Sequence, residues 1–124
     1  MDTTKPLALI VEDDKNLALA FGEALEDAGY EVEIIFDGQT ALDRLAVVTP
    51  AMVVLDLHIP HVRGADVLRH IRREERLAKI RVIVATADDM EASRLGELAN
   101  LVLLKPIGYQ QLRDLSARLR PRQL

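Results

Sequence analysis

Four carboxylates, one hydroxyl and one ammonium follow short apolar runs in this sequence: Glu12, Asp13, Asp14, Asp56, Thr86 and Lys105. Two carboxylates 4 Å apart repel each other by about 4 kcal/mol at an effective dielectric constant of 20. A cluster of acids is therefore unfavourable unless a cation or a proton compensates it. Because oxygen donors are present and Cys is absent, a hard cation is expected, with Mg²⁺ first and Mn²⁺ as an alternative.

The same side chains have the chemistry that phosphoryl transfer needs. A carboxylate beside Mg²⁺ can act as the nucleophile, and the phosphoryl oxygens then need cationic and hydroxyl partners. Lys105 and Thr86 are side chains of these types. Structural roles are the alternative, since Asp13 or Asp14 could cap a helix and Asp56 could begin a turn. Their coincidence after successive apolar runs favours the chemical interpretation.

Five apolar runs predict the strands that would position these residues: Leu7–Val11, Val32–Phe36, Ala51–Leu55, Val82–Ala85 and Leu101–Leu104. Four of the runs are continuously apolar, which is typical of strands covered on both faces. The second run alternates as Glu31-Val32-Glu33-Ile34, which predicts a strand at an edge of the sheet.

Amphipathic segments between the runs predict five helices. Their apolar stripes span about 17–28, 41–46, 67–71, 89–98 and 112–119. The fourth stripe is thin, and Gly96 interrupts it. Alternation of strand and helix predicts an α/β fold with a parallel sheet and helices on both faces. Ligands of such sheets bind beyond the carboxyl ends of the strands, where the polar residues stand.

Composition limits the class of protein. The 124 residues fit one domain, and 49% apolar with 29% charged residues argue against bulk disorder. No apolar run approaches the roughly 20 residues of a membrane helix, and no signal peptide opens the sequence, so a cytoplasmic globular domain is expected. The absence of Cys excludes disulfides, zinc–thiolate sites and Cys nucleophiles.

Charge is distributed unevenly along the chain. Residues 1–62 carry 12 acids and 3 bases, a net charge of −9, whereas residues 63–124 carry 8 acids and 13 bases, a net charge of +5, which together give −4. The asymmetry predicts an acidic pocket built by the first half. Direct binding of nucleic acid is not expected of a chain that is acidic as a whole.

Four stretches, in this order, resemble the receiver domain of two-component response regulators. They are Leu9-Ile10-Val11-Glu12-Asp13-Asp14, Val53-Val54-Leu55-Asp56-Leu57-His58-Ile59-Pro60, Val82-Ile83-Val84-Ala85-Thr86-Ala87 and Leu104-Lys105-Pro106. The resemblance, to receivers of the chemotaxis-regulator type, implies a flavodoxin-like sheet of order 2-1-3-4-5. It also implies a single receiver domain over 1–124, with an ordered core of about 5–119 and a tail or linker stub over 120–124.

The resemblance implies a phosphorylation site. Asp56 would accept the phosphoryl group, Thr86 would hydrogen-bond it and Lys105 would pair with it. The donor would be a sensor histidine kinase or a histidine phosphotransfer protein. The domain would be a signalling switch, not an enzyme, and would assist only its own phosphorylation and dephosphorylation. The Lys105–Pro106 bond would be cis, as it usually is in the family.

The resemblance also implies a metal site for Mg²⁺ or Mn²⁺. Asp13 would bind the ion directly and Glu12 through water. Asp56 and the backbone carbonyl of His58 would complete the protein ligands. Asp14 would then begin the following helix instead of binding metal.

Several positions depart from the family pattern. Val102 stands where an aromatic residue is common, so an aromatic rotamer switch is not available there. Arg63 replaces a common Asp, and Ile107 replaces a common Phe. His58 and Asp88 occupy variable positions that tune dephosphorylation in the family.

Output partners are expected on the face formed by segments 89–98, 101–104 and 112–119, which would also host a homodimer.

The alternative to a phosphorylated receiver is a receiver-fold docking module that acts without phosphorylation, and Val102 is its best support. A dehalogenase-type phosphatase is a further alternative. It is disfavoured because such an enzyme needs a second Asp as general acid at the position that His58 occupies. A zinc site of Asp56, His58 and His61 is disfavoured, because strand geometry would have to bring all three together.

Arginines recur at helical spacing after the third run, at positions 69, 72, 73 and 76. Glu74 and Glu75 accompany them, so a solvated helix face is the first interpretation. A docking surface for an acidic partner is the alternative.

Overall fold

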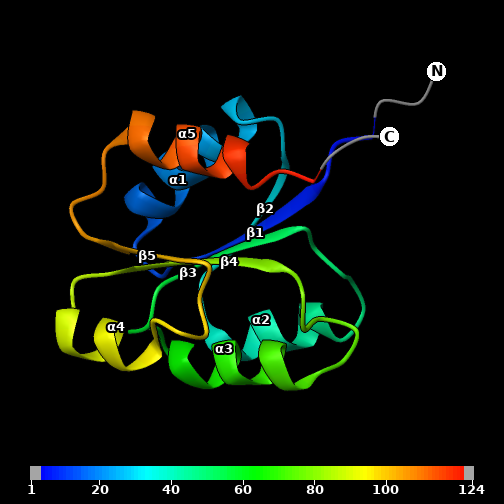
Figure 1. Cartoon of the computed structure of the whole chain (residues 1–124), viewed down its shortest axis with the longest axis vertical. Coiled ribbons are helices and arrows are strands. Elements are labelled where there is room, and N and C mark those ends of the chain that lie inside the picture. The colour runs from blue at the N-terminus through cyan, green and yellow to red at the C-terminus, as the bar shows by residue number, and fades with distance from the viewer. Residues whose placement is uncertain (1–3, 122–124) are drawn as a thin grey trace.

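The computed structural model describes residues 4–121 and shows a central sheet between two layers of helices (Figure 1). The five strands are β1 (Leu7–Val11), β2 (Glu31–Ile35), β3 (Met52–Leu55), β4 (Arg81–Thr86) and β5 (Leu101–Leu104). All neighbouring pairs are parallel, and the order is β2-β1-β3-β4-β5. The flavodoxin-like α/β fold predicted above is confirmed.

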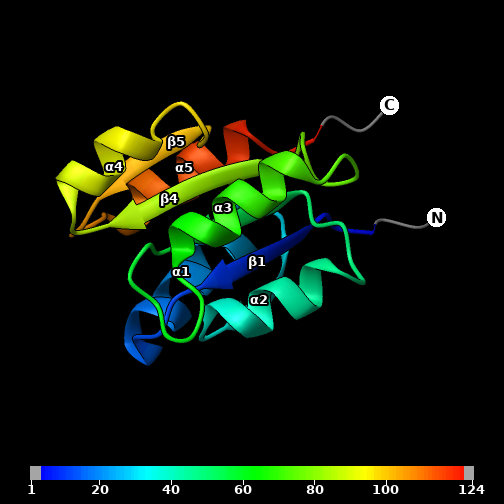
Figure 2. The same ribbon diagram turned by 90° about the horizontal axis from the view of Figure 1, so that it is seen from below.

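The helices are α1 (Lys15–Asp27), α2 (Gly38–Leu45), α3 (Gly64–Arg73), α4 (Asp89–Leu95) and α5 (Tyr109–Arg118). Helices α1 and α5 cover one face of the sheet, and α2, α3 and α4 cover the other (Figure 1). In Figure 2, the arrows of β1 and β4 point toward the same edge of the sheet. The residues that follow the strands are therefore gathered at one edge.

The central strands β1, β3 and β4 are buried on both faces because helices cover both, whereas β5, at a sheet edge, is only half-buried. Along β1, Leu9 and Val11 belong to one hydrophobic core, whereas Ala8 and Ile10 belong to the other. Successive side chains of a strand point to opposite faces, so both sets must be apolar. This burial explains the continuous apolar runs, and the more exposed β2 lies at the predicted sheet edge.

Several predicted boundaries differ from the structure, at α4 and β2 among others. Helix α4 ends at Leu95 with Gly96 as its C-cap, instead of continuing to Leu98, because glycine is a poor helix former and the chain turns there toward β5. Strand β2 begins one residue earlier than predicted, at Glu31, and Phe36 lies outside it.

Part of the predicted tail can be described. The guanidinium of Arg120 donates a hydrogen bond to the carbonyl of Ala28 at 2.8 Å, so it contacts the end of α1. Residues 122–124 of that tail lie outside the described residues. Between residues 4 and 121, no helix has the length and apolar character to cross a bilayer.

Candidate functional site

Three carboxylates meet beyond the carboxyl ends of β1 and β3. These strands are paired in register with Val11 opposite Leu55, so Glu12 and Asp56 leave the sheet side by side. One carboxylate oxygen from each of Glu12, Asp13 and Asp56 lies within 4.8 Å of the others. Glu12 and Asp56 are only 2% and 6% exposed, whereas Asp13 is exposed. Two buried acids and one accessible acid therefore form one cluster, the acid cluster.

Lys105 follows β5 and extends its side chain into the acid cluster. Its Nζ lies 2.6 Å from Glu12 Oε1 and 3.3 Å from Asp56 Oδ2. The backbone N–H of Lys105 donates to Thr86 O at 2.8 Å, and the Lys105–Pro106 bond is cis. The predicted lysine is therefore placed in direct contact with both buried acids.

The acid cluster has unusual electrostatics because it is buried. Burial raises the pKa of Glu12, and the charge of Asp56 raises it further, although hydrogen bonds from Lys105 and from the Asp14 N–H oppose this shift. Burial alone would lower the pKa of Lys105, but Glu12 and Asp56 outweigh it and the pKa is raised. The lysine therefore stays charged. Three ionised carboxylates and one ammonium leave a charge of −2, which a divalent cation would neutralise.

The donor set of the acid cluster fits Mg²⁺. All three side chains offer oxygen atoms, which hard cations prefer. Their mutual distances allow one ion to bridge them, and the exposure of Asp13 leaves room for water, which Mg²⁺ usually retains. Asp14 plays the predicted structural part, since its side chain accepts a hydrogen bond from Leu17 N at 3.1 Å and caps α1.

Thr86 ends β4 and is fully buried. Because β4 pairs with β3, Thr86 stands at the same edge of the sheet as Asp56. Its Oγ1 accepts a hydrogen bond from Asp88 N at 3.1 Å. The Thr86 hydroxyl is thus hydrogen-bonded to the loop that leads into α4.

A contact that the sequence did not predict joins the loops after β3 and β4. His58 Nε2 lies 3.0 Å from Asp88 Oδ2, and Asp88 Oδ1 accepts from Glu91 N at 3.0 Å to cap α4. The backbone N–H of His58 also donates to Asp56 Oδ1 at 3.2 Å. His58 therefore contacts Asp56 through its backbone N–H and the loop after β4 through its ring. The variable character of positions 58 and 88 was the only signal of this pair.

The disfavoured zinc site is not assembled. Within the described part of the chain, His58 groups with Asp88 and Glu91, not with Asp56 and His61. His61 has a φ of 71° and is exposed, and it belongs to neither group of possible metal ligands among residues 4–121.

Val102 is half-buried in β5 and packs against the core beneath α2, α3 and α4. An aliphatic side chain therefore fills this position. On the neighbouring elements α4, β5 and α5, the large apolar side chains Met90, Leu104 and Tyr109 are exposed. Met90 and Leu104 belong to elements of the face predicted to meet output partners, whereas the hydroxyl of Tyr109 donates a hydrogen bond to Asp27 of α1.

Comparison with known proteins gives the same family for most of the chain. Residues 8–117 match the model of the response regulator receiver domain. The probable methanogenesis regulatory protein FilR2 of Methanothrix harundinacea is 36% identical over 86% of this chain and 76% of its own length. The response regulator ArlR of Staphylococcus saprophyticus is 33% identical over 84% of this chain. The aligned region is only 47% of ArlR, so the chain spans about half of that relative.

The fold has close structural neighbours as well. The chemotaxis response regulator CheY4 of Vibrio cholerae superimposes with a TM-score of 0.84 over 94% of this chain and 99% of CheY4, at 23% identity. At that identity the likeness concerns the fold alone. It agrees with the strand order and helix placement described above.

Proposed function

Since this chain belongs to the response regulator receiver family, whose members are signalling switches in two-component systems, we propose that it is phosphorylated on Asp56. The donor is a histidine kinase or a histidine phosphotransfer protein, and the reaction depends on Mg²⁺, with Mn²⁺ as a substitute. One observation carries the proposal: the buried carboxylate of Asp56 contacts the Lys105 ammonium and lies within 4.8 Å of carboxylate oxygens of two further acids. A single receiver domain over 1–124, located in the cytoplasm, is part of the same proposal.

In this proposal Asp56 is the nucleophile. A carboxylate oxygen of Asp56 forms a bond to phosphorus as the bond between phosphorus and the donor's histidine nitrogen breaks. The ammonium of Lys105, 3.3 Å from Asp56 Oδ2, pairs with the negative charge of the transferred group. Oδ1 already accepts the N–H of His58, which orients the carboxylate.

Glu12, Asp13, Asp56 and the backbone carbonyl of His58 hold the metal ion in the proposal. The ion supplies positive charge to the phosphoryl oxygens and relieves repulsion among the carboxylates. The raised pKa of Glu12 supports this assignment, because it reports a buried acid that lacks full compensation.

Thr86 connects the phosphoryl group to the output face. Its hydroxyl accepts the N–H of Asp88 and is free to donate its own proton to a phosphoryl oxygen. That new bond would shift the loop that begins α4. The expected output surface is the α4–β5–α5 face, for an output protein or for a homodimer, and Val102 requires that the signal reach it without an aromatic rotamer change.

Intact mass tests the proposal directly. The protein is incubated with acetyl phosphate, with and without Mg²⁺, beside Asp56→Asn and the matched control Asp14→Asn, which keeps a capping side chain. A gain of one phosphoryl group is expected only with Mg²⁺, and in Asp14→Asn but not in Asp56→Asn. No gain in a folded wild type, beside a working receiver, would favour the docking-module alternative.

A further inference from the structure

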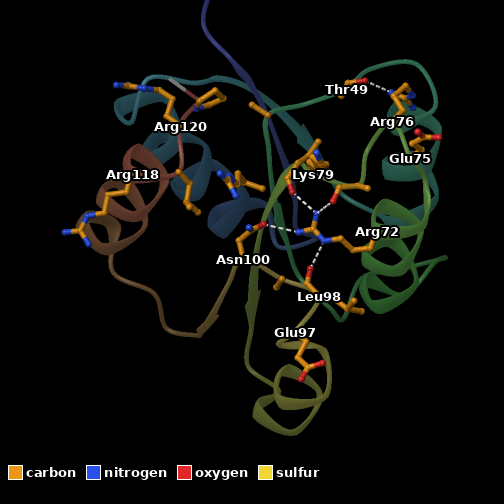
Figure 3. A pocket seen from close by; sticks show the side chains of 17 residues that line it. Thr49, Arg72, Glu75, Arg76, Lys79, Glu97, Leu98, Asn100, Arg118 and Arg120 are labelled. Atoms are coloured by element: carbon orange, nitrogen blue, oxygen red, sulfur yellow. Dashed lines mark hydrogen bonds between the residues drawn. The ribbon is translucent and has the colours of Figure 1, made fainter. Parts of the chain in front are cut away.

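A cavity of about 990 Å³ opens at the amino-terminal edge of the sheet (Figure 3). It lies at the opposite ends of the strands from the acid cluster. It lies among the segments that lead into β3, β4 and β5, the end of α3 and the end of α5. Among residues 4–121, six cationic side chains line it: Arg72, Arg76, Lys79, Arg81, Arg118 and Arg120. The acids that line it are Glu75 and Glu97, so this cationic groove has a charge of +4 in a chain of −4.

Arg72 lies at the centre of the cationic groove (Figure 3). Its guanidinium donates to the carbonyls of Leu98, Ala78 and Ile80 at 2.7, 3.0 and 2.7 Å, and to Asn100 Oδ1 at 2.9 Å. All four acceptors are neutral, so they satisfy the donors without cancelling the charge. The predicted solvated face is therefore wrong for Arg72, which is half-buried because it ties the α3–β4 and α4–β5 loops to α3.

Two more arginines are held in the same way. Arg76 donates to Thr49 Oγ1 (Figure 3) and to the carbonyl of Leu45, and Arg120 donates to the carbonyl of Ala28 at 2.8 Å. Neither has a carboxylate partner within residues 4–121. Their positions are fixed and their charges remain uncompensated.

The other three cations are free to bind a ligand. Among the described residues, the side chains of Lys79, Arg81 and Arg118 make no hydrogen bond or ion pair with the protein. Burial lowers the pKa of Arg72, and the charge of Arg81 lowers it further. Positive charges therefore repel one another across the cationic groove, and an anionic ligand would relieve that repulsion.

The lining also limits the class of anion. The volume lies at the upper end of the roughly 300–1,000 Å³ typical of ligand sites, too large for a single inorganic ion. In the described part of the chain, no aromatic side chain lines the groove, so a nucleobase has no ring there to stack on, as single-stranded nucleic acids need. Ile80, Leu98 and Leu119 provide apolar surface between the cations. Guanidinium groups match carboxylates in shape and hydrogen bonding.

We propose that the cationic groove binds an acidic, Asp- and Glu-rich segment of a partner protein. Carboxylates of that segment pair with Lys79, Arg81 and Arg118, whereas Arg72 and Arg76 shape the site. The groove lies at the opposite edge of the sheet from Asp56, so an acidic partner can bind without covering the acid cluster. The inference does not depend on phosphorylation.

A labelled ten-residue peptide of alternating Glu and Ser tests this inference by fluorescence anisotropy at low salt. The triple variant Lys79→Ala, Arg81→Ala, Arg118→Ala should weaken binding at least tenfold. The control triple Arg69→Ala, Arg73→Ala, Arg94→Ala makes the same change in charge at exposed positions outside the groove and should weaken it less than threefold. Equal weakening by both triples would overturn the proposal, because it would show attraction by overall charge.

Two further measurements use the wild-type protein and so do not depend on how the variants fold. Amide NMR shifts on adding the peptide should concentrate at residues 78–81 and 97–100, and shifts confined to other regions would contradict the groove. A peptide of alternating Gln and Ser should not bind. Tighter binding of a single-stranded oligonucleotide with the same number of charges would assign the site to nucleic acid instead.

Discussion

The carbonyl oxygen of Asp56 occupies the space into which a side chain on Gly64 would project. A Cβ added to Gly64 would lie 2.2 Å from Asp56 O and 2.6 Å from Leu57 Cα. The N–H of Gly64 donates to Leu57 O at 3.0 Å. The first turn of α3 therefore packs directly on the backbone that carries the central carboxylate.

Gly64→Ala should destabilise the fold, because both close contacts are with backbone atoms that cannot rotate away. The expected loss of unfolding free energy is about 2–4 kcal/mol, measured by urea denaturation. Gly96→Ala is the matched control: its Cβ would meet nothing nearer than Ala92 O at 3.5 Å, and its helical φ of −58° suits alanine. The control should change stability by less than about 1 kcal/mol, and equal losses in the two variants would contradict the packing described.

Mg²⁺ should stabilise the fold, because a folded protein that gathers three carboxylates binds the ion better than the unfolded chain does. A hundredfold excess over Kd corresponds to about 2.7 kcal/mol. Asp13→Asn removes one carboxylate of the acid cluster and should weaken Mg²⁺ binding, whereas Asp14→Asn makes the same charge change outside it. Thermal denaturation across a Mg²⁺ titration measures both. A wild-type melting temperature that does not change with Mg²⁺ would count against the acid cluster as a metal site.

Stability at alkaline pH should depend on Tyr30. Burial raises the pKa of Tyr30 to about 12 from 10.0, although the charges of Arg120 and Arg81 oppose the shift. Between these values the unfolded chain loses the phenolic proton and the folded protein keeps it. The contribution of Tyr30 is therefore complete below pH 10 and is lost as pH rises toward 12, by at most about 3 kcal/mol.

Tyr30→Phe, compared in a Tyr109→Phe background, isolates this effect, since those are the two tyrosines of the chain. The variant should lose about 1 kcal/mol at pH 8, because Tyr30 Oη donates to Ser116 O at 2.8 Å. It should then decline less steeply above pH 10. Urea denaturation at pH 8 to 11 provides the comparison, and parallel slopes in the two proteins would refute the prediction.

The pKa of Asp88 should lie below its usual value of 3.8, because Glu91 N–H and the His58 ring donate hydrogen bonds to the carboxylate. Asp88 then contributes stability above pH 3.8 that is lost as pH falls through its lowered pKa. His58→Ala should raise the pKa of Asp88, and His61→Ala should leave it unchanged. Carboxyl carbon NMR shifts in Mg²⁺-free buffer report both, and an unchanged pKa in His58→Ala would exclude the contact.

Burial explains which elements the sequence could predict. Residues of β1 and β3 face apolar helices on both sides, so these strands appear as continuous apolar runs. The carboxyl-edge location of Glu12 and Asp56 follows from strand order and polarity alone. Lys105 could be placed at the same edge because it follows β5, and its side chain is long enough to reach Glu12 and Asp56.

Contacts between loops and single side chains could not be predicted in the same way. The pairing of His58 with Asp88 depends on how two loops leave adjacent strands, which no residue periodicity records. Arg72 has the spacing of an exposed helical stripe, but its guanidinium donates hydrogen bonds to backbone carbonyls of two nearby loops. Where a guanidinium finds buried acceptors, its exposure depends on tertiary structure and not on helical position.

The acid cluster and the cationic groove lie at opposite ends of the strands. This arrangement gives the molecule an electric dipole moment along the strand direction. In the field of another charged macromolecule, the domain should turn before contact, presenting its carboxyl edge to cations and its amino edge to anions. Such orientation acts over the Debye length, about 8 Å at physiological ionic strength. Dilute salt would therefore lengthen the range of this alignment, and concentrated salt would remove it.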